Sequence, residues 1–298
     1  MPPSHIPRAL TAFPKSYALL SSADTCTCLA IFVHGFAGSP TSTWRDFPGL
    51  VDQLRLEFPF WQTTDLFFYS YRSRRPIEVS AQDFTSFLDI VIKGEVDQIA
   101  PAEFPFKPTF LEVPALLPTR HYKRLHLLAH SEGAVVIRRA IADRLLSYEQ
   151  TLRKIEPDAS AAKLHEMIEG YVEADYLMNA HMHLFASACL GTNFSSGYGF
   201  LISYSDIINA IAASFASRND LLPESPILIQ LQRQTEKGSK EYPRARALGA
   251  EILFGEHDHI VFLNGYDCDR VVPYEPGHNH TSVCKPTLSY KRPLEFVR

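Results

Sequence analysis

Five short apolar runs divide the chain. They are continuous, without the alternation of polar and apolar residues typical of a strand with one exposed face. Strands buried on both faces have this pattern, because helices cover both sides of a parallel sheet. We therefore expect buried, parallel strands at residues 29–33 (LAIFV), 66–69 (LFFY), 125–129 (LHLLA), 182–187 (MHLFAS) and 250–254 (AEILF).

Helical spacing appears between these runs. In SAQDFTSFLDIVIK, residues 80–93, Ser80 and Asp83 have the spacing of a capping box, which predicts a helix start at Ser80. The apolar face of this helix would consist of Phe84, Phe87, Leu88, Val91 and Ile92. Strands that alternate with helices predict an α/β fold: a doubly wound, mostly parallel sheet with helices on both faces, in a single domain over residues 1–298.

Two segments interrupt the alternation. Residues 101–120 contain five prolines and predict an irregular excursion before the run at 125–129. Residues 192–247 combine an apolar helical patch at 207–215 with a polar tail. Either segment could overhang a pocket, and we expect residues 192–247 to form a cap or lid within the domain.

The composition is that of a globular protein without a general attraction for polyanions. Of the 298 residues 46% are hydrophobic and 21% are charged, and the formal net charge is -4. No apolar stretch has the length of a membrane span, and the proline-rich N-terminus lacks the apolar core of a signal peptide. Five dispersed cysteines fit free thiols in a reducing compartment. We expect a cytoplasmic protein without a nucleic acid partner, and the oligomeric state stays open.

Ser131 lies where the run at 125–129 changes into a helical pattern, in HLLAHSEGAVVIRRA. A sharp turn here would lift the serine hydroxyl above the carboxyl end of the sheet, in the layout of a nucleophile elbow. Gly133 fits such a crowded turn, whereas Ala129 replaces the first glycine of the G-x-S-x-G form. The alternative is a serine that only caps the next helix. That helix would bury a face made of Ala134, Ile137, Ile141 and Leu145.

A second segment, FVHGFAGSPTSTW at residues 32–44, could supply an oxyanion hole. Gly35 after the first strand permits a close approach of the backbone, and the amide of Phe36 or Ala37 could be one donor. The backbone amide of Glu132 would be the other donor, so the identity of its side chain need not matter. An ordinary glycine-rich turn is the alternative.

A carboxylate candidate follows the last apolar run. Asp258 comes soon after residues 250–254, at the carboxyl edge of the sheet, where ligands bind in open α/β folds. A carboxylate there can orient a histidine and stabilise the imidazolium that forms when a serine loses its proton. Glu256 and Asp269 are the alternatives, because sequence alone does not fix a position in a loop.

A base candidate lies in the late loop EPGHNHTSVCKP, residues 275–286. We favour His280, with His278 as the alternative. The resulting order of serine, aspartate and histidine is one of the known orders of such residues along a chain. Most of the other ten histidines, His130 included, are expected at the surface or in local hydrogen bonds.

In these segments the chain resembles the α/β-hydrolases. It is most similar to the esterase and lipase-like branch that includes GPI inositol-deacylase-like and "serine active site containing" proteins. The resemblance rests on FVHGFAGSPTSTW, LFFYSYRS, LLAHSEGAVV, LFASACLGTNF and HTSVCKP, in this order. It implies Ser131, Asp258 and His280 as nucleophile, acid and base, and an oxyanion hole of Phe36 and Glu132. LFASACLGT lacks the proline and histidine of the family's T-P-H-x-G segment, so the family's substrate is not carried over.

We expect a serine hydrolase that cleaves carboxylic esters, of a small molecule or a lipid, through an acyl-enzyme and with no metal or organic cofactor. Gly35, Trp44 and Leu190 are the candidate substrate-binding residues, since their surroundings are apolar. One alternative is a catalytically silent binding module with the same fold. Another is a metallohydrolase that uses the paired histidines 181 and 183, 257 and 259, and 278 and 280 as ligands.

Overall fold

One sheet forms the centre of the computed structural model, which describes residues 5–10, 13, 15–23, 26–92, 99–100, 122–192 and 219–297. Within these residues it has nine strands in the order β5-β1-β2-β4-β3-β6-β7-β8-β9. The strands are β1 His5–Leu10, β2 Tyr17–Ser21, β3 Cys28–Val33, β4 Thr64–Tyr69, β5 Ile99–Ala100, β6 Arg124–His130, β7 His181–Phe185, β8 Glu251–Leu253 and β9 Arg270–Val271. The expected excursion at 101–120, the patch at 207–215 and half of the expected cap lie outside the described residues.

Parallel pairing runs from β4 through β3, β6, β7 and β8 to β9. All five strands expected from the apolar runs are present, and the mostly parallel sheet is confirmed. The other part of the sheet was not expected: β1 and β2 form an antiparallel hairpin, and β2 adds antiparallel to β4. Strand β1 was not predicted because it contains Pro7 and Arg8, and a run with a proline and a charge is not typical of a buried strand.

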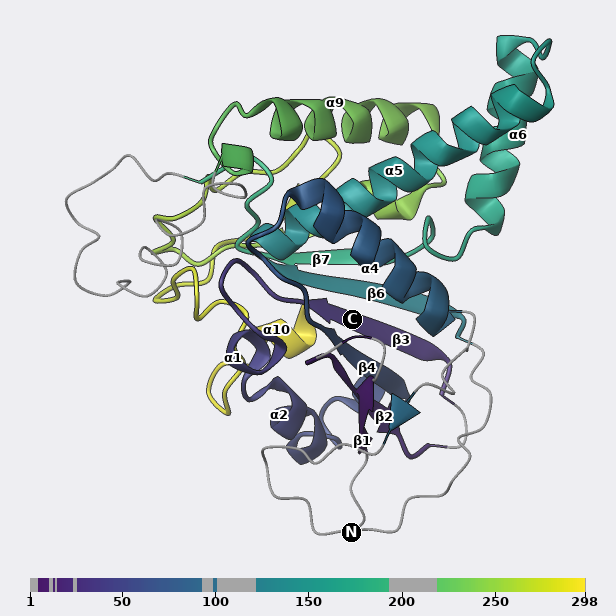
Figure 1. Cartoon of the computed structure of the whole chain (residues 1–298). Helices are drawn as coiled ribbons and strands as arrows, with labels where there is room; N and C mark the ends of the chain where they lie inside the picture. Colours follow the sequence, from purple (N-terminus) through teal and green to yellow (C-terminus); the bar gives the residue numbers. More distant parts are fainter. Residues whose placement is uncertain are drawn as a thin grey trace.

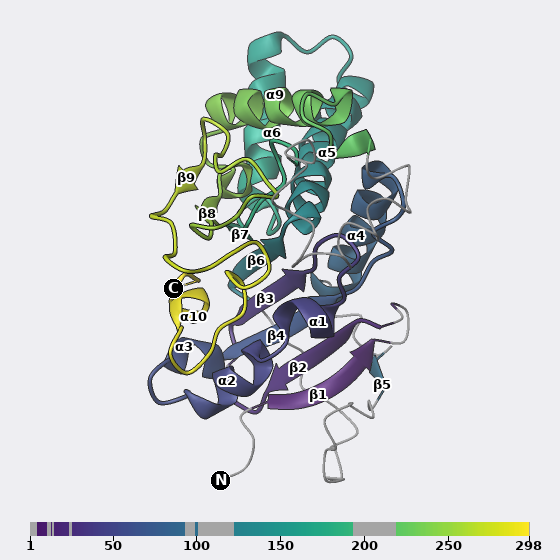
Figure 2. The ribbon, with the colours of Figure 1, turned by 90° about the vertical axis from the view of Figure 1, so that its left-hand side faces the viewer.

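Helices cover both faces of the sheet (Figures 1 and 2). On one face lie α4 Ile77–Ile92, α5 Glu132–Ile155, α6 Ala161–Ala174 and α9 Pro226–Glu241. On the other lie the short helices α1 Pro40–Trp44, α2 Phe47–Gln53, α3 Pro59–Gln62 and α10 Arg292–Glu295. A 3-10 turn at Arg246–Leu248 leads into β8. The face expected for α5 is buried at Ala134, Ile137 and Ile141 and half-buried at Leu145.

Helix α4 starts earlier than expected. It begins at Ile77, directly after Pro76, and Ser80 lies inside it, buried and without a hydrogen bond from its hydroxyl. The capping box expected at Ser80 was therefore wrong. Proline excludes the residue before it from helical geometry, and the carboxylate of Asp220 accepts the Ile77 amide at 3.2 Å, so the start is satisfied from another segment.

An aromatic cluster fills the core between β3 and the short helices. The ring of Phe32 stacks on Phe68 with centroids 4.5 Å apart, and packs edge-on against Phe47 and Trp44 at 4.9 and 5.2 Å. Such contacts add to the free energy gained from burying the rings. Trp44 is 0% exposed. It packs in the core, unlike the substrate contact expected for it.

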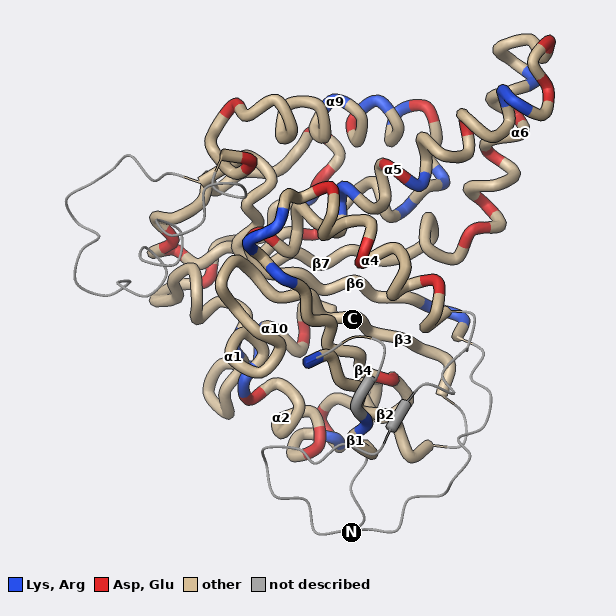
Figure 3. The backbone as a smooth tube through the Cα atoms, in the orientation of Figure 1, with Lys and Arg blue, Asp and Glu red and all other residues tan. Residues whose placement is uncertain are grey.

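Charged residues of both signs are spread over the outer helices. Figure 3 shows acidic and basic positions mixed along α5, α6 and α9. Ion pairs lie within or beside these helices, for example Arg153 with Glu149 and Lys163 with Glu156. Among the helices described, none has both the length and the apolar content needed to cross a membrane.

Candidate active site

Ser131 occupies a strained turn between β6 and α5. Its φ is 55° and its ψ is -121°, a left-handed conformation that residues with a side chain rarely adopt. The turn is tied to the next strand, because the Ser131 amide donates to the carbonyl of Phe185 at 3.0 Å and its carbonyl accepts the Ala188 amide at 3.3 Å. The serine side chain makes no capping bond to α5, so the simple N-cap alternative was wrong.

Two glycines permit this turn to lie close to the end of β3. A Cβ at Gly133 would lie 2.5 Å from the carbonyl oxygen of His34, which is impossible without movement of the backbone. A Cβ at Gly35 would lie 2.9 Å from the Cβ of Ser131. The expected close approach of position 35 to the serine is therefore present.

A continuous hydrogen-bond chain joins a hydroxyl, an imidazole and a carboxylate. His280 Nε2 lies 3.0 Å from Ser131 Oγ, and His280 Nδ1 lies 2.9 Å from Asp258 Oδ2. The carboxylate accepts at Nδ1–H, which leaves the lone pair of Nε2 for the serine hydroxyl to donate to. Asp258 Oδ1 also accepts the amides of Ile260 and Val261 at 2.9 and 3.4 Å. All three side chains are buried.

The charge of Asp258 is stabilised within this chain. Burial alone raises the pKa of its carboxyl group, but the neighbouring imidazole of His280 and the two backbone amides outweigh burial and lower the pKa below its ordinary value. The group is therefore an ionised acceptor near neutral pH, and it can stabilise positive charge on the imidazole.

Two loops, one before and one after β9, carry Asp258 and His280, and backbone hydrogen bonds join them. The amides of residues 256 and 257 donate to the carbonyls of Glu275 and His278 at 3.0 and 2.9 Å. Gly255 permits this pairing, because a Cβ there would lie 2.5 Å from the His278 carbonyl oxygen. We call these segments, residues 254–258 and 275–280, the paired loops.

The alternative acids and the alternative base lie elsewhere. Glu256 is exposed and accepts the Gly277 amide at 3.2 Å. Asp269 is buried against Arg138, which links α5 to the turn before β9. The ring of His278 stacks on Tyr290 with centroids 3.6 Å apart. Of the candidates named from sequence, Asp258 and His280 are the two that the structure brings to Ser131.

The amides beside the serine differ in their availability. The Ala37 amide donates to Ser73 Oγ at 2.8 Å, so it is already used. Within the described part of the chain, the amides of Phe36 and Glu132 donate to no other group. Glu132 is the first residue of α5, where helix amides have no partner inside the helix and attract negative charge.

The loop that carries Phe36 is fixed by His34 and Tyr71. His34 Nδ1–H donates to the Gly35 carbonyl at 2.8 Å, and its Nε2 accepts the Tyr71 amide at 3.3 Å. The two rings stack with centroids 4.5 Å apart, and the Tyr71 hydroxyl donates to the His34 carbonyl at 3.1 Å. Burial lowers the pKa of His34 to about 4, so this imidazole stays neutral and can accept.

The side chain of Glu132 has an unusual environment that its sequence position did not indicate. It is 0% exposed, and neither carboxyl oxygen has a hydrogen-bond partner. Burial, with a smaller contribution from Asp220, raises the pKa of this carboxyl group well above its ordinary value. The neutral, protonated form is therefore favoured next to the serine.

His130, expected to make only local hydrogen bonds, makes one across most of the chain. Its Nε2–H donates to the carbonyl oxygen of His280 at 2.7 Å. The adjacency of His130 to Ser131 was the one available signal, because no periodicity predicts a bond to a residue 150 positions away.

The paired histidines do not gather at one place. His183 lies with His126 and His181 at the amino edge of the sheet, whereas His257 and His259 are exposed on the loop after β8. Throughout the described ranges, no three histidine, cysteine, aspartate or glutamate side chains are placed to hold a metal ion. The metallohydrolase alternative therefore has no supporting geometry there.

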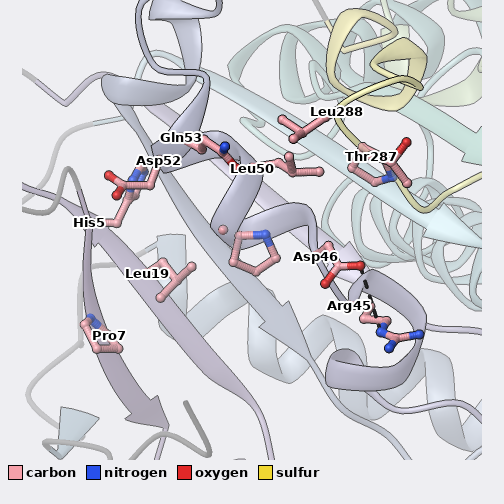
Figure 4. Close-up of a pocket in the computed structure, with 13 residues that line it drawn as sticks. His5, Pro7, Leu19, Arg45, Asp46, Leu50, Asp52, Gln53, Thr287 and Leu288 are labelled. Carbon is pink, nitrogen blue, oxygen red and sulfur yellow. Dashed lines mark ion pairs between the residues drawn. The ribbon is translucent and has the colours of Figure 1, made fainter. Parts of the chain in front are cut away.

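A cavity of about 670 Å³ lies apart from the hydrogen-bond chain (Figure 4). Its walls come from β1, β2, α2 with the two residues before it, and residues 286–288, and they include Leu19, Leu50 and Leu288. Neither Ser131 nor His280 lines it. Leu190, a candidate substrate contact, is half-buried and packs against the core.

Comparison with known proteins gives a likeness of structure only. No protein-family model matches the sequence, and no curated protein does. The lipase BlEst2 from Bacillus licheniformis, in mature form, has a TM-score of 0.54 at 12% identity, with 95% of this chain and 98% of that chain covered. Est1E from Butyrivibrio proteoclasticus has a TM-score of 0.45 at 13% identity, covering 99% and 94%.

Phospholipase PlaB from Legionella pneumophila is a third similar structure. Its TM-score is 0.45 at 13% identity, and the match covers 78% of this chain but only 40% of PlaB. BlEst2 matches along nearly its whole length, and this likeness concerns the fold alone. The chain has the α/β-hydrolase fold.

Proposed function

We propose that the protein is a serine hydrolase that cleaves carboxylic esters. The observation that carries the proposal is the unbroken hydrogen-bond chain from Asp258 through His280 to Ser131, with the serine in a strained turn at the carboxyl end of β6. A nucleophile, a base and an orienting carboxylate within hydrogen-bond reach are the arrangement that acyl transfer requires. Lipases and esterases among the similar structures agree with this reaction class.

In the first half of the proposed reaction, His280 Nε2 takes the proton of Ser131 Oγ, and the oxygen attacks the ester carbonyl. The carbonyl oxygen becomes an oxyanion, which accepts hydrogen bonds from the amides of Phe36 and Glu132. Asp258 stabilises the imidazolium. The imidazolium then donates its proton to the departing alcohol, and the acyl group stays on the serine as an ester.

In the second half, His280 takes a proton from water and the resulting hydroxide attacks the acyl-enzyme. Collapse of the second tetrahedral intermediate returns the proton to Ser131 and releases the carboxylic acid. The steps use only side chains and amides of this chain. The narrower resemblance to the GPI inositol-deacylase-like branch, the cap at residues 192–247 and a cytoplasmic location belong to the same proposal. All five cysteines are free, in keeping with a reducing compartment.

The sharpest test is labelling with a fluorophosphonate, followed by peptide mapping. We expect the label on Ser131, because only an activated serine hydroxyl attacks such a phosphorus centre rapidly. Ser80→Ala is the matched control, since Ser80 is a buried serine of α4 whose hydroxyl has no hydrogen bond. Absence of labelling at Ser131 in the folded protein would instead favour a silent binding module.

A panel of esters with short and long acyl chains would then define the substrate. We propose an apolar acyl group, because Phe36 and Leu190 are half-buried and follow closely on Gly35 and Ala188, which contact the turn at Ser131. Hydrolysis that rises with acyl length would indicate a lipase, and hydrolysis restricted to short chains an esterase.

A further inference from the structure

His130 is the last residue of β6 and directly precedes Ser131. It is buried, and its Nε2–H donates to the carbonyl oxygen of His280 at 2.7 Å. The two imidazole rings lie 4.9 Å apart between centroids, at an angle of 54°. The strand end that carries the serine is therefore bonded directly to the backbone of the residue that receives the serine's proton.

The hydrogen bond fixes the tautomer of His130. A carbonyl oxygen only accepts, so the proton resides on Nε2 and Nδ1 carries the lone pair. Nδ1 has no hydrogen-bond partner and faces Gly35, where a Cβ would lie 2.8 Å away. The ring thus fills the space between the loop that bears His280 and the turn that leads to Phe36.

The ring also stays uncharged. Burial, and then the neighbouring His280, lower the pKa of His130 to about 3, while Asp258 raises it by a smaller amount. Lys285 is the other charged group acting on it. A neutral His130 leaves Asp258 to interact with the imidazolium that forms on His280.

We propose that His130 is a positioning residue, which holds the backbone of His280 so that Nε2 stays within hydrogen-bond reach of Ser131 Oγ. This inference rests on the proposed ester hydrolysis. The paired loops tie His280 to Asp258, but they do not by themselves set its distance from the serine. A displacement of about 1 Å at a reacting group can lower the rate about 100-fold, so one buried bond to the base is sufficient to matter.

Two variants of the full chain distinguish the effect of the His130 hydrogen bond from the effect of the space that its ring fills. His130→Gln keeps an N–H donor at nearly the reach of Nε2, whereas His130→Phe keeps a ring without a donor. His183→Phe is the matched control, since His183 is also a buried histidine, on the neighbouring strand β7 and towards the opposite edge of the sheet. Each protein would be assayed with a p-nitrophenyl ester and a fluorophosphonate, and its folded fraction measured by thermal unfolding.

We expect His130→Phe to lower kcat roughly 10- to 100-fold with KM changed less than about twofold, because the base and not the binding of substrate is displaced. The labelling rate at Ser131 should fall in parallel. His130→Gln should recover most of kcat, and His183→Phe should keep kcat once corrected for the folded fraction.

Two results would overturn the proposal, and they differ. Wild-type protein that neither hydrolyses the ester nor labels at Ser131 would remove the proposed function together with the role of His130. Active wild-type protein, combined with equal kcat in the folded fractions of His130→Phe and wild type, would remove the role of His130 alone. Equal losses in His130→Phe and His183→Phe would do the same.

Discussion

The two edges of the sheet each hold a buried group of histidines, but only one has the connections needed for proton transfer. At the carboxyl edge, His280 lies 2.9 Å from the carboxylate of Asp258 and 3.0 Å from a hydroxyl. At the amino edge, His183 lies 3.2 Å from another histidine, His126, and its nearest carboxylate, Glu251, is 3.9 Å away.

The difference shows that burial and the presence of imidazoles do not make a catalytic group. Burial, and then the neighbouring histidines, lower the pKa of His126 and His183 to about 3, and each ring keeps one nitrogen without a partner. Without a carboxylate in hydrogen-bond contact, the second proton that would make either ring an imidazolium is strongly disfavoured. A base must accept a proton transiently, and the carboxyl edge supplies the counter-charge that makes this possible.

Removal of the serine should have the largest effect. Ser131→Ala should lower kcat by about 10⁶-fold, because hydroxyl, imidazole and carboxylate act as one unit. His183→Gln at the amino edge should leave kcat within about twofold of wild type, since His183 touches no reacting group. Steady-state ester hydrolysis measures both. Comparable losses in the two variants would mean that the edges do not differ in the proposed way.

The carboxylate should matter next. Asp258→Asn should lower kcat by about 10⁴-fold, because an amide can donate to Nδ1 and leave the proton of His280 on Nε2. Glu251→Gln is the matched change at the amino edge, where the carboxylate pairs with Arg270 at 3.0 Å and lies 3.9 Å from His183. We expect its kcat to equal that of wild type. A small effect of Asp258→Asn would contradict the assignment of this carboxylate.

Acid should destabilise the amino edge. A histidine whose pKa is about 3 in the folded protein and 6.5 when unfolded stabilises the fold fully above pH 6.5, and this stability is lost as the pH falls towards 3. Urea unfolding should therefore show His183→Gln losing about 2 kcal/mol less than wild type between pH 7.5 and pH 5. An identical pH dependence of the unfolding free energy in both proteins would contradict a His183 whose pKa is lowered by burial.

A rise in pH should destabilise the fold at Glu132, whereas a fall in pH does so at His183. Its pKa lies well above the ordinary 4.5 in the folded protein, so the protonated form stabilises the fold below pH 4.5 and that stability is lost as the pH rises. Glu132→Gln should remove this loss of unfolding free energy between pH 5 and pH 8, because an amide does not ionise. Urea unfolding at the two pH values measures it, and an unchanged slope would contradict a buried, protonated carboxyl group.

The parallel part of the sheet could be predicted from the sequence, because each of its central strands is a continuous apolar run. Continuous apolar runs revealed β3, β4, β6, β7 and β8, because strands covered on both faces tolerate few polar residues. The hairpin of β1 and β2 was missed, since Pro7 and Arg8 break such a run. The start of α4 was misplaced because Asp220, far along the chain, satisfies it.

The site shows the same limit. Ser131 stands at a recognisable joint between a strand and a helix, so residue type and position named it, whereas His280 lies in a late loop and was named with His278 as the alternative. Trp44 was misjudged, because an aromatic residue in a loop-like segment looks the same whether it faces a substrate or the core. The bond of His130 and the isolation of the Glu132 carboxyl depend on three-dimensional neighbours, which no local pattern encodes.

The backbone pairing between residues 254–258 and 275–280 also bears on how the site comes apart. Asp258 and His280 lie on two segments that are joined by backbone hydrogen bonds. One segment therefore cannot move away while the other keeps its position. We expect these segments to open in one cooperative event, so hydrogen exchange should give the amides at positions 256 and 257 the same free energy of opening. The hydrogen-bond chain from Asp258 to Ser131 would then be either complete or broken, with no intermediate form.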